Sequence, residues 1–282
     1  MFGDKMDGIL LINKTTGMTS HDVVMKIRKL LKTKKVGHCG TLDPDATGVL
    51  VICVNKATKA IQFLTADSKE YIATLSLGKS TDTYDASGKV LEEKEFNGIK
   101  NLEEVLNSFV GKQKQLPPIY SAIKVNGKKL YEYARENKEV EIKPRDIEIK
   151  EIELLKVEDN EITFRVLCSK GTYIRSLCVD IANKLGYPGH MKSLMRSQSG
   201  DFKLEDCFTL EDVEQGNYRL ISMDEAFTSF DKMVVDEKIV IYGKTIKSDI
   251  DHNVAVYSEE GKLLAIYGPD GKGYLKSIRG LF

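Results

Sequence analysis

The chain has 282 residues, its 42 Lys and Arg balance its 42 Asp and Glu, and 41% of its residues are hydrophobic. This composition excludes a disordered chain, and the longest apolar run, at 48–54, falls far short of the roughly 20 residues that span a bilayer. The five cysteines form no C-x-x-C pair, which argues against a zinc site or a disulfide framework. We therefore expect a cytoplasmic globular protein with a large domain and a smaller companion.

The N-terminal part of the chain alternates short apolar runs with turn residues. We expect a buried strand at 8–14, then a helix that Thr19 or Ser20 caps and whose apolar side chains form one stripe. The glycine-rich residues 37–48 predict a loop that leads into a strand at 49–54. The next expected elements are a helix near 56–64, a strand near 70–78, a turn in TDTYDASGK and a strand in VLEEKEF.

The second half of the chain contains the clearest hairpin. Residues 147–158 and 161–169 alternate apolar with polar side chains and are separated by Asp159 and Asn160, which favour a tight turn. Asn101 is expected to cap a helix that ends at Phe109. The remaining predicted elements are a proline-stiffened stretch, strand and helix in 115–137, a helix at 171–186, and a β-leaning tail after an acidic stretch.

These elements predict an α+β fold. Many strand pairs resemble hairpins, and the sequence has neither G-x-G-x-x-G nor a Walker motif, so a doubly wound nucleotide-binding fold is disfavoured. We expect a mainly antiparallel or mixed β-sheet core with flanking helices in residues 1–230, and a small β-rich domain in residues 231–282.

The net charge of zero conceals separated charges. Residues 26–35 hold six cations and no acid, and residues 112–129 hold five lysines and no acid, whereas residues 205–231 carry eight acids and one arginine. The two basic stretches are candidate phosphate-binding surfaces, although a solvated helix face is the commoner explanation for any single charge run.

The segment GHCGTLDPDATG, at 37–48, is the most unusual in the chain. Pro44 favours an extended backbone at Asp43, so that carboxylate is held on a stiff loop where a catalytic group could sit. Three alternatives stay open from these residues alone. Asp43 could simply accept backbone hydrogen bonds in a turn, it could act with Asp45 as a carboxylate pair, or it could join His38 and Asp45 in a metal-dependent hydrolase.

Five blocks of sequence together resemble the TruB family of tRNA pseudouridine synthases: LLINKTTGMTSHDVV, GHCGTLDPDATGVL, TDTYDASG, PPIYSAIKVNGKKLYEYAR and CSKGTYIRSL. The resemblance implies a pseudouridine synthase fold with a PUA-like C-terminal domain. The interleaved lysines and tyrosines at about 120–145 add the hypothesis that this insertion clamps the T-arm of tRNA as a mobile lobe. The resemblance also implies isomerisation of uridine 55 in the T-loop by base flipping, without cofactor or metal, with Asp43 as the catalytic nucleophile.

The same resemblance assigns further site residues. Arg175 resembles the arginine that pairs with the catalytic aspartate, and Tyr71 the tyrosine that stacks on the flipped base. Tyr173 resembles a pocket-lining residue, His38 the histidine that takes the vacated stacking place in the RNA loop, and Lys14 the basic residue of an N-terminal substrate-binding block.

The chain departs from the family pattern at a few positions. Thr15 replaces the usual proline, Cys39 stands where threonine is common, and the stretch around Arg196 holds fewer arginines. A non-catalytic RNA-binding or tRNA-folding protein remains the alternative function. Beyond tRNA, the sequence implies no membrane and no obligate protein partner.

Overall fold

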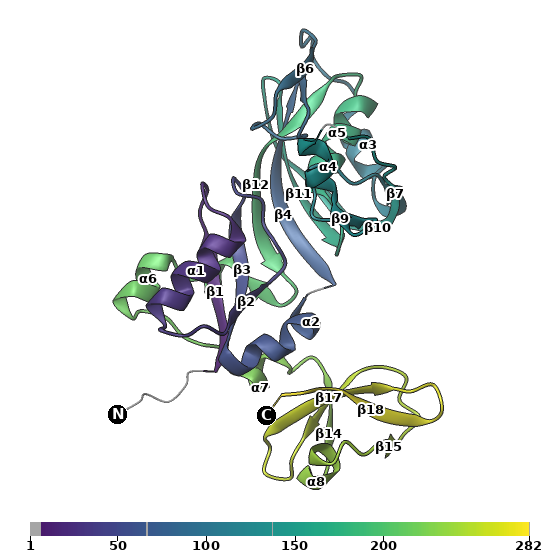
Figure 1. Cartoon of the computed structure of the whole chain (residues 1–282). Coiled ribbons are helices and arrows are strands. Elements are labelled where there is room, and N and C mark those ends of the chain that lie inside the picture. The colour runs from purple at the N-terminus through teal and green to yellow at the C-terminus, as the bar shows by residue number, and fades with distance from the viewer. Residues whose placement is uncertain (1–6, 66, 137, 282) are drawn as a thin grey trace. The chain divides into compact units, whose positions relative to one another are not determined.

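A computed structural model describes residues 7–65, 67–136 and 138–281 (Figure 1). These residues divide into two compact units. The first unit comprises residues up to Pro44, Val49–Thr65 and the chain from Leu204 onward, and the second comprises Asp45–Gly48 and Ala66–Lys203. This division runs through the expected 1–230 domain, so the boundary at 230 stays a prediction.

The first unit begins with the strand and helix that the sequence predicts. Strand β1 (Gly8–Lys14) is buried along almost its whole length, as its apolar run requires. Helix α1 (Ser20–Leu30) buries the apolar stripe of Val23, Val24 and Ile27. Strand β3 (Thr47–Val54) and the short helices η1 (Asn55–Ala60) and α2 (Ile61–Leu64) also agree with the sequence, although the first of these helices is 3-10 in type.

One expectation in this unit is wrong. The start of the glycine-rich segment is not a loop, because β2 (Val36–Cys39) pairs antiparallel with β3, Val36 opposite Val54 and Cys39 opposite Val51. The loop proper is therefore the short stretch between the two strands, with Asp43 at its centre. Pairing with a fully buried neighbouring strand outweighs the low strand propensity of glycine here.

The C-terminal part of the first unit forms its own sheet, with the strand order β14-β16-β17-β18-β15. Val254, Val256 and Tyr267 lie at the centre of its core and are buried. The β-rich character expected for the tail is confirmed. Its elements are β14 (Asp231–Val234), α8 (Glu237–Ile241), β15 (Ile246–Lys247), β16 (Val254–Tyr257), β17 (Leu263–Pro269) and β18 (Tyr274–Gly280). It is preceded by η2 (Leu204–Asp206), α6 (Leu210–Gln215) and α7 (Met223–Ala226).

The second unit is built on a sheet with the strand order β12-β4-β11-β10-β7, all paired antiparallel. The strands are β4 (Ser68–Leu77), β7 (Gly111–Gln115), β10 (Arg145–Glu158), β11 (Glu161–Ser169) and β12 (Gly189–Ser199). The β10–β11 hairpin is confirmed, and Asp159 at its turn adopts φ +50°. Thr47 and Gly48 add a short parallel pairing to β12.

Two strands of this sheet were missed in the sequence. Strand β12 contains two bulges, after Met191 and after Arg196, which break the alternation of polar and apolar side chains that identifies a strand. Strand β7 has the sequence GKQKQ, whose polar residues predict no buried face. The mainly antiparallel α+β core is nevertheless as expected.

Helices and short hairpins complete the second unit. Helix α5 (Ile174–Lys184) packs against β12 and β4. Asn101 precedes α3 (Leu102–Asn107), but its side chain makes no capping hydrogen bond, so its expected capping role is wrong. The other elements are β5 (Lys79–Thr81), β6 (Val90–Glu93), β8 (Lys124–Val125), β9 (Lys128–Lys129) and α4 (Leu130–Arg135). In the described residues, no helix is both long and apolar enough to cross a membrane.

Candidate active site

The loop that carries Asp43 is held by a hydrogen-bonded residue on each side of it. The Ser20 hydroxyl oxygen accepts from the Leu42 amide at 2.9 Å and lies 3.3 Å from the Leu42 carbonyl oxygen. The Lys14 ammonium donates to the Pro44 carbonyl oxygen at 2.8 Å. Asp43 itself is half-buried. Its carboxylate therefore sits on a backbone whose position is set immediately before and immediately after it.

Lys14 ends strand β1, and only 1% of its surface is exposed. A buried ammonium is costly unless hydrogen bonds replace its water. Two carbonyl oxygens do so in part, those of Thr15 at 2.9 Å and of Pro44. The amide of Gly17 also donates to the Pro44 carbonyl, at 3.1 Å, so the turn after β1 and the Asp43 loop are joined at one oxygen.

Of the two candidate caps of helix α1, Thr19 fills the role and Ser20 does not. Thr19 and Asp22 form a capping box, in which the Thr19 hydroxyl accepts from the Asp22 amide and the Asp22 carboxylate accepts from the Thr19 amide. The side chain of Ser20 is thereby left to bond Leu42, 22 residues away. No local pattern identifies this contact, because its partner is a backbone group in another segment.

His38 lies in β2, opposite Ile52 of β3, and is half-buried. Beside it, the thiols of Cys39 and Cys53 lie 3.6 Å apart, and both are buried. The hydrogen bond to Cys39 and burial raise the pKa of the Cys53 thiol well above its usual range. These two strands form a rigid base for the loop between them.

Arg175 stands in the first turn of α5 and is only 7% exposed, so it is a buried side chain and not a surface arginine of the helix. Its guanidinium donates to the Thr83 carbonyl oxygen at 3.2 Å and to the Tyr120 carbonyl oxygen at 3.0 Å. One of its nitrogens also lies 3.8 Å from the Asp85 carboxylate. A single side chain thus joins the helix to two loops that were singled out in the sequence.

The backbone of Tyr173 is held by a second side chain. The Gln115 amide group accepts from the Tyr173 N–H at 2.8 Å and donates to the Tyr173 carbonyl at 3.0 Å. One turn into the helix, Ser176 donates to the Leu116 carbonyl at 2.8 Å. The start of α5 is therefore tied to the segment that leads into the 120–145 region, and Gln115 is a positioning residue that the sequence did not indicate.

The TDTYDASG turn is ordered around Asp85. One oxygen of its carboxylate accepts from the Thr83 hydroxyl at 2.7 Å and from the Ser87 hydroxyl at 2.6 Å. Tyr84, between these groups, adopts φ +65°, a conformation that is costly for an aromatic residue. The Met191 amide donates to the Tyr84 carbonyl at 3.0 Å and fixes the turn to β12.

Tyr71 lies on β4 with 8% of its surface exposed, in register with Val166 on one side and Arg196 on the other. Arg196 is buried as well, and the backbone of Gly48 packs directly on it. Burial, followed by the nearby Arg196 charge, lowers the pKa of Lys69, which lies two residues from Tyr71 on the same strand. Tyr71 thus lies close to two buried basic side chains, Lys69 and Arg196.

The six predicted site residues divide equally between the two units. Lys14, His38 and Asp43 belong to the first unit, and the other three, Tyr71, Tyr173 and Arg175, belong to the second. Within each unit they lie on elements anchored by side-chain hydrogen bonds. In the described residues, no three His, Cys, Asp or Glu side chains are arranged to hold a metal ion, so the hydrolase hypothesis lacks a ligand set.

Comparisons with known proteins agree with this architecture. A family model described as TruB family pseudouridylate synthase (N terminal domain) matches residues 28–174, and one described as tRNA pseudouridylate synthase B C-terminal domain matches residues 175–235. A chain in the crystal structure of a Cbf5–Nop10–Gar1 complex is similar over 93% of this chain and 78% of its own length, with 29% identity and a TM-score of 0.70. The fold and these matches define the class, the pseudouridylate synthases.

Curated relatives extend the similarity to nearly the full length. The protein named tRNA pseudouridine synthase B of Bacillus cereus is 46% identical over an alignment of 297 positions that covers 97% of each chain. The protein of the same name from Bacillus subtilis is 46% identical over an alignment of 300 positions, again with 97% of each chain covered. The chain belongs to the TruB family of pseudouridylate synthases.

Proposed function

We propose that this enzyme converts uridine 55 in the T-loop of tRNA to pseudouridine, with Asp43 as the nucleophile. The names of its relatives support tRNA as the substrate. The aspartate follows from the resemblance of the GHCGTLDPDATG block. The observation that carries the proposal is the Asp43 loop, which Ser20 and Lys14 hold on both sides of the carboxylate.

The reaction needs a fixed, ionised carboxylate beside the nucleotide. The bond between C1′ and N1 of uracil breaks, the base turns, and a new bond joins C1′ to C5, so the hydrogen of C5 leaves and N1 gains one. No oxidant, reductant or cofactor enters this balance. Positioning is therefore the main contribution that the protein can make, because a misplaced nucleophile loses most of its effective concentration.

The other site residues receive roles from the family resemblance. We propose that Arg175 keeps Asp43 ionised and placed, since an adjacent cation favours a carboxylate. Tyr71 stacks on the flipped base, Tyr173 lines the same pocket, and His38 fills the vacated place in the RNA loop. Lys14 contacts the substrate in the family-based prediction. Its hydrogen bonds to two backbone carbonyls support a further role, the positioning of the Asp43 loop.

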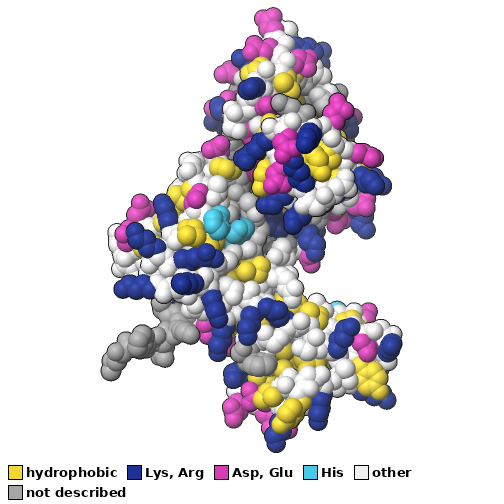
Figure 2. Space-filling model, viewed as in Figure 1, with side chains coloured by type: hydrophobic (Ala, Val, Ile, Leu, Met, Phe, Trp, Pro, Cys, Tyr) yellow, Lys and Arg dark blue, Asp and Glu magenta, His cyan; other side chains and the backbone are white. Residues whose placement is uncertain are grey.

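Basic surfaces would hold the phosphates of the RNA. Figure 2 displays Lys and Arg side chains gathered over the surface where α1 lies in Figure 1. Arg28 is used internally, because it donates to the Val36 carbonyl at 3.0 Å. The lysines of the 26–35 run are exposed and form no ion pair with any described residue; they are Lys26, Lys29, Lys32, Lys34 and Lys35.

The remaining parts of the chain complete the proposal. The region 120–145, here named the 120–145 lobe, would clamp the T-arm, and residues 231–282 would act as a short PUA-like RNA-binding domain. Limited proteolysis tests the first point: tRNA should protect the lobe, and equal cleavage with and without tRNA would contradict it.

The decisive experiment is tritium release from tRNA labelled at C5 of uracil. The wild-type protein should release tritium, and Asp43→Ala should abolish release while tRNA binding persists. Asp45→Ala is the matched control, because Asp45 is an exposed carboxylate two residues away. A wild-type protein that binds tRNA but releases nothing would instead support the non-catalytic RNA-binding function.

A further inference from the structure

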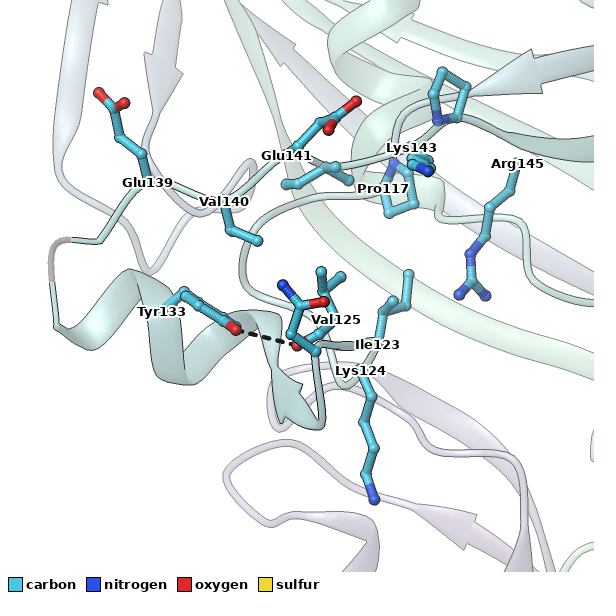
Figure 3. A pocket seen from close by; sticks show the side chains of 13 residues that line it. Pro117, Ile123, Lys124, Val125, Tyr133, Glu139, Val140, Glu141, Lys143 and Arg145 are labelled. Carbon is cyan, nitrogen blue, oxygen red and sulfur yellow. Dashed lines mark hydrogen bonds between the residues drawn. The ribbon is translucent and has the colours of Figure 1, made fainter.

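A pocket of about 620 Å³ lies at the 120–145 lobe, outside the proposed active site (Figure 3). Its volume is within the range of about 300–1,000 Å³ that is typical of small-molecule sites. None of the six predicted site residues lines it. Its apolar lining comes from both ends of the lobe and consists of Pro117, Ile123, Val125, Val140, Ile142 and Pro144.

The alternation of side chains along residues 139–144 explains this apolar wall. Successive side chains of an extended chain point to opposite sides. Val140 and Ile142 are half-buried, whereas Glu139 and Glu141 are exposed. Figure 3 shows the two carboxylates pointing away from the pocket and Val140 pointing toward it. Val140 and Ile142 therefore give the pocket an apolar wall, and Glu139 and Glu141, which also line the pocket, turn their carboxylates away from it.

One amide group at the pocket is available for hydrogen bonding. Asn126 adopts φ +52° in the Asn-Gly turn between β8 and β9, and it lines the pocket. Its side chain makes no hydrogen bond to any described residue. An asparagine amide presents one acceptor and a donor side by side, which matches the edge of a nucleobase.

The cations of the pocket are also available. Lys124, Lys143 and Arg145 line it and form no ion pair with any part of the chain that the structure describes. By contrast, Lys128 and Lys138 of the same lobe both pair with Glu136. Some lysines of the lobe are thus neutralised by its own glutamate, whereas Lys124, Lys143 and Arg145 remain as cations at the pocket. Such cations can bind a phosphate group.

We propose that this pocket binds one unpaired nucleotide of the RNA substrate, separate from the uridine that reacts. The base packs against the wall of Val140 and Ile142 with its edge at Asn126, and its phosphate lies among the cations. This inference rests on the proposed function, because it takes tRNA as the substrate. Single-stranded bases are commonly bound by such a combination of packing and edge recognition.

Filling the pocket tests the proposal. Val140→Trp should raise the KM for tRNA in the tritium-release assay about tenfold with kcat within about twofold, since the loss of one packed base weakens binding by roughly this amount. Asn126→Asp should also raise KM, because it replaces the amide donor with a negative charge. Aspartate is chosen because, like asparagine, it tolerates the left-handed backbone conformation of this turn. Val157→Trp, at an exposed position of β10, is the matched control and should leave KM unchanged.

Cross-linking supplies a readout that does not depend on turnover. tRNA sparsely substituted with 4-thiouridine should cross-link to peptides that contain 117–126 or 139–145 in the wild type, and much less in Val140→Trp. The pocket proposal would be overturned if Val140→Trp had an unchanged KM and the wild type gave no cross-link to these peptides. Tritium release by the wild type would still support the proposed function in that case. A wild type that releases no tritium would instead refute the proposed function, and cross-links to the pocket peptides would still support nucleotide binding.

Discussion

The ammonium group of Lys14 lies 2.8 Å from the carbonyl oxygen of Pro44, the residue that follows Asp43. These residues are 30 positions apart, and the contact converts the end of a buried strand into a support for the proposed catalytic loop. Together with Ser20 at Leu42, it gives Asp43 a fixed backbone on both sides.

Replacing Lys14 with methionine should therefore reduce catalysis more than RNA binding. The methionine side chain has a similar length but cannot donate to Pro44, and loss of a buried hydrogen bond from a charged group costs about 1.5–3 kcal/mol. We expect kcat for tritium release to fall at least about tenfold as the loop loses its position. Lys150→Met, at an exposed position of β10, is the control. An unchanged kcat in a folded Lys14→Met protein would show that the loop does not need this support.

Arg175→Lys tests whether the shape of the guanidinium matters as well as its charge. Lysine keeps the charge but cannot donate in fixed directions to Thr83, Tyr120 and the side of Asp85 at once. We expect kcat to fall by about a hundredfold, with tRNA affinity from filter binding changed less than threefold. Arg219→Lys, an exposed arginine paired with Glu225, should change neither quantity. A kcat within twofold of the wild type would mean that charge alone suffices.

Gly48 is expected to tolerate substitution least among the glycines near the site. It adopts φ +102°, and an added Cβ would lie 2.2 Å from the Arg196 carbonyl oxygen. Gly48→Ala should reduce the free energy of unfolding by about 3 kcal/mol or more in urea titrations, because backbone atoms must move. Gly17→Ala, at φ +78° with nothing within 4 Å, should cost only about 1 kcal/mol. Equal costs at the two positions would contradict the close contact.

Acid should weaken α1 through its capping box. The hydrogen bonds from Thr19 hold the pKa of the Asp22 carboxyl below its ordinary value of 3.8. A carboxyl whose pKa is lower when folded contributes stability above that ordinary value and loses it as the pH falls through the folded pKa. Asp22→Asn should thus flatten the acid side of the stability curve measured by urea unfolding from pH 6 downward. Asp249→Asn, at an exposed loop position, should preserve the wild-type slope.

Binding of tRNA should depend steeply on salt although the chain has no net charge. Each lysine that neutralises a phosphate contributes about 0.7–0.9 to the slope of log K against log salt. The double variant Lys26→Ala, Lys29→Ala should lower this slope in fluorescence titrations, whereas Lys150→Ala, Lys156→Ala on β10 should leave it unaltered. A flat salt response of the wild type would mean that these lysines do not face phosphate.

The sequence by itself determined the elements whose signals are local. The β10–β11 hairpin, helix α1 and strand β1 follow from alternation, helical periodicity and a short apolar run, each within about a dozen residues. The sequence blocks also identified the family, because they combine several such segments in a fixed order.

Only the tertiary structure decided which side chains support these segments. The side chains of Ser20, Gln115 and Arg175 bond backbone groups that are 22, 58 and 92 residues away in the sequence, respectively. A local sequence pattern cannot contain both partners of such a hydrogen bond. Strand β12 was hidden for a related reason: its bulges and polar residues conceal the alternation, and it becomes a strand because β4 supplies its hydrogen bonds. The chemistry of a residue is local, but the position that makes it useful depends on distant parts of the chain.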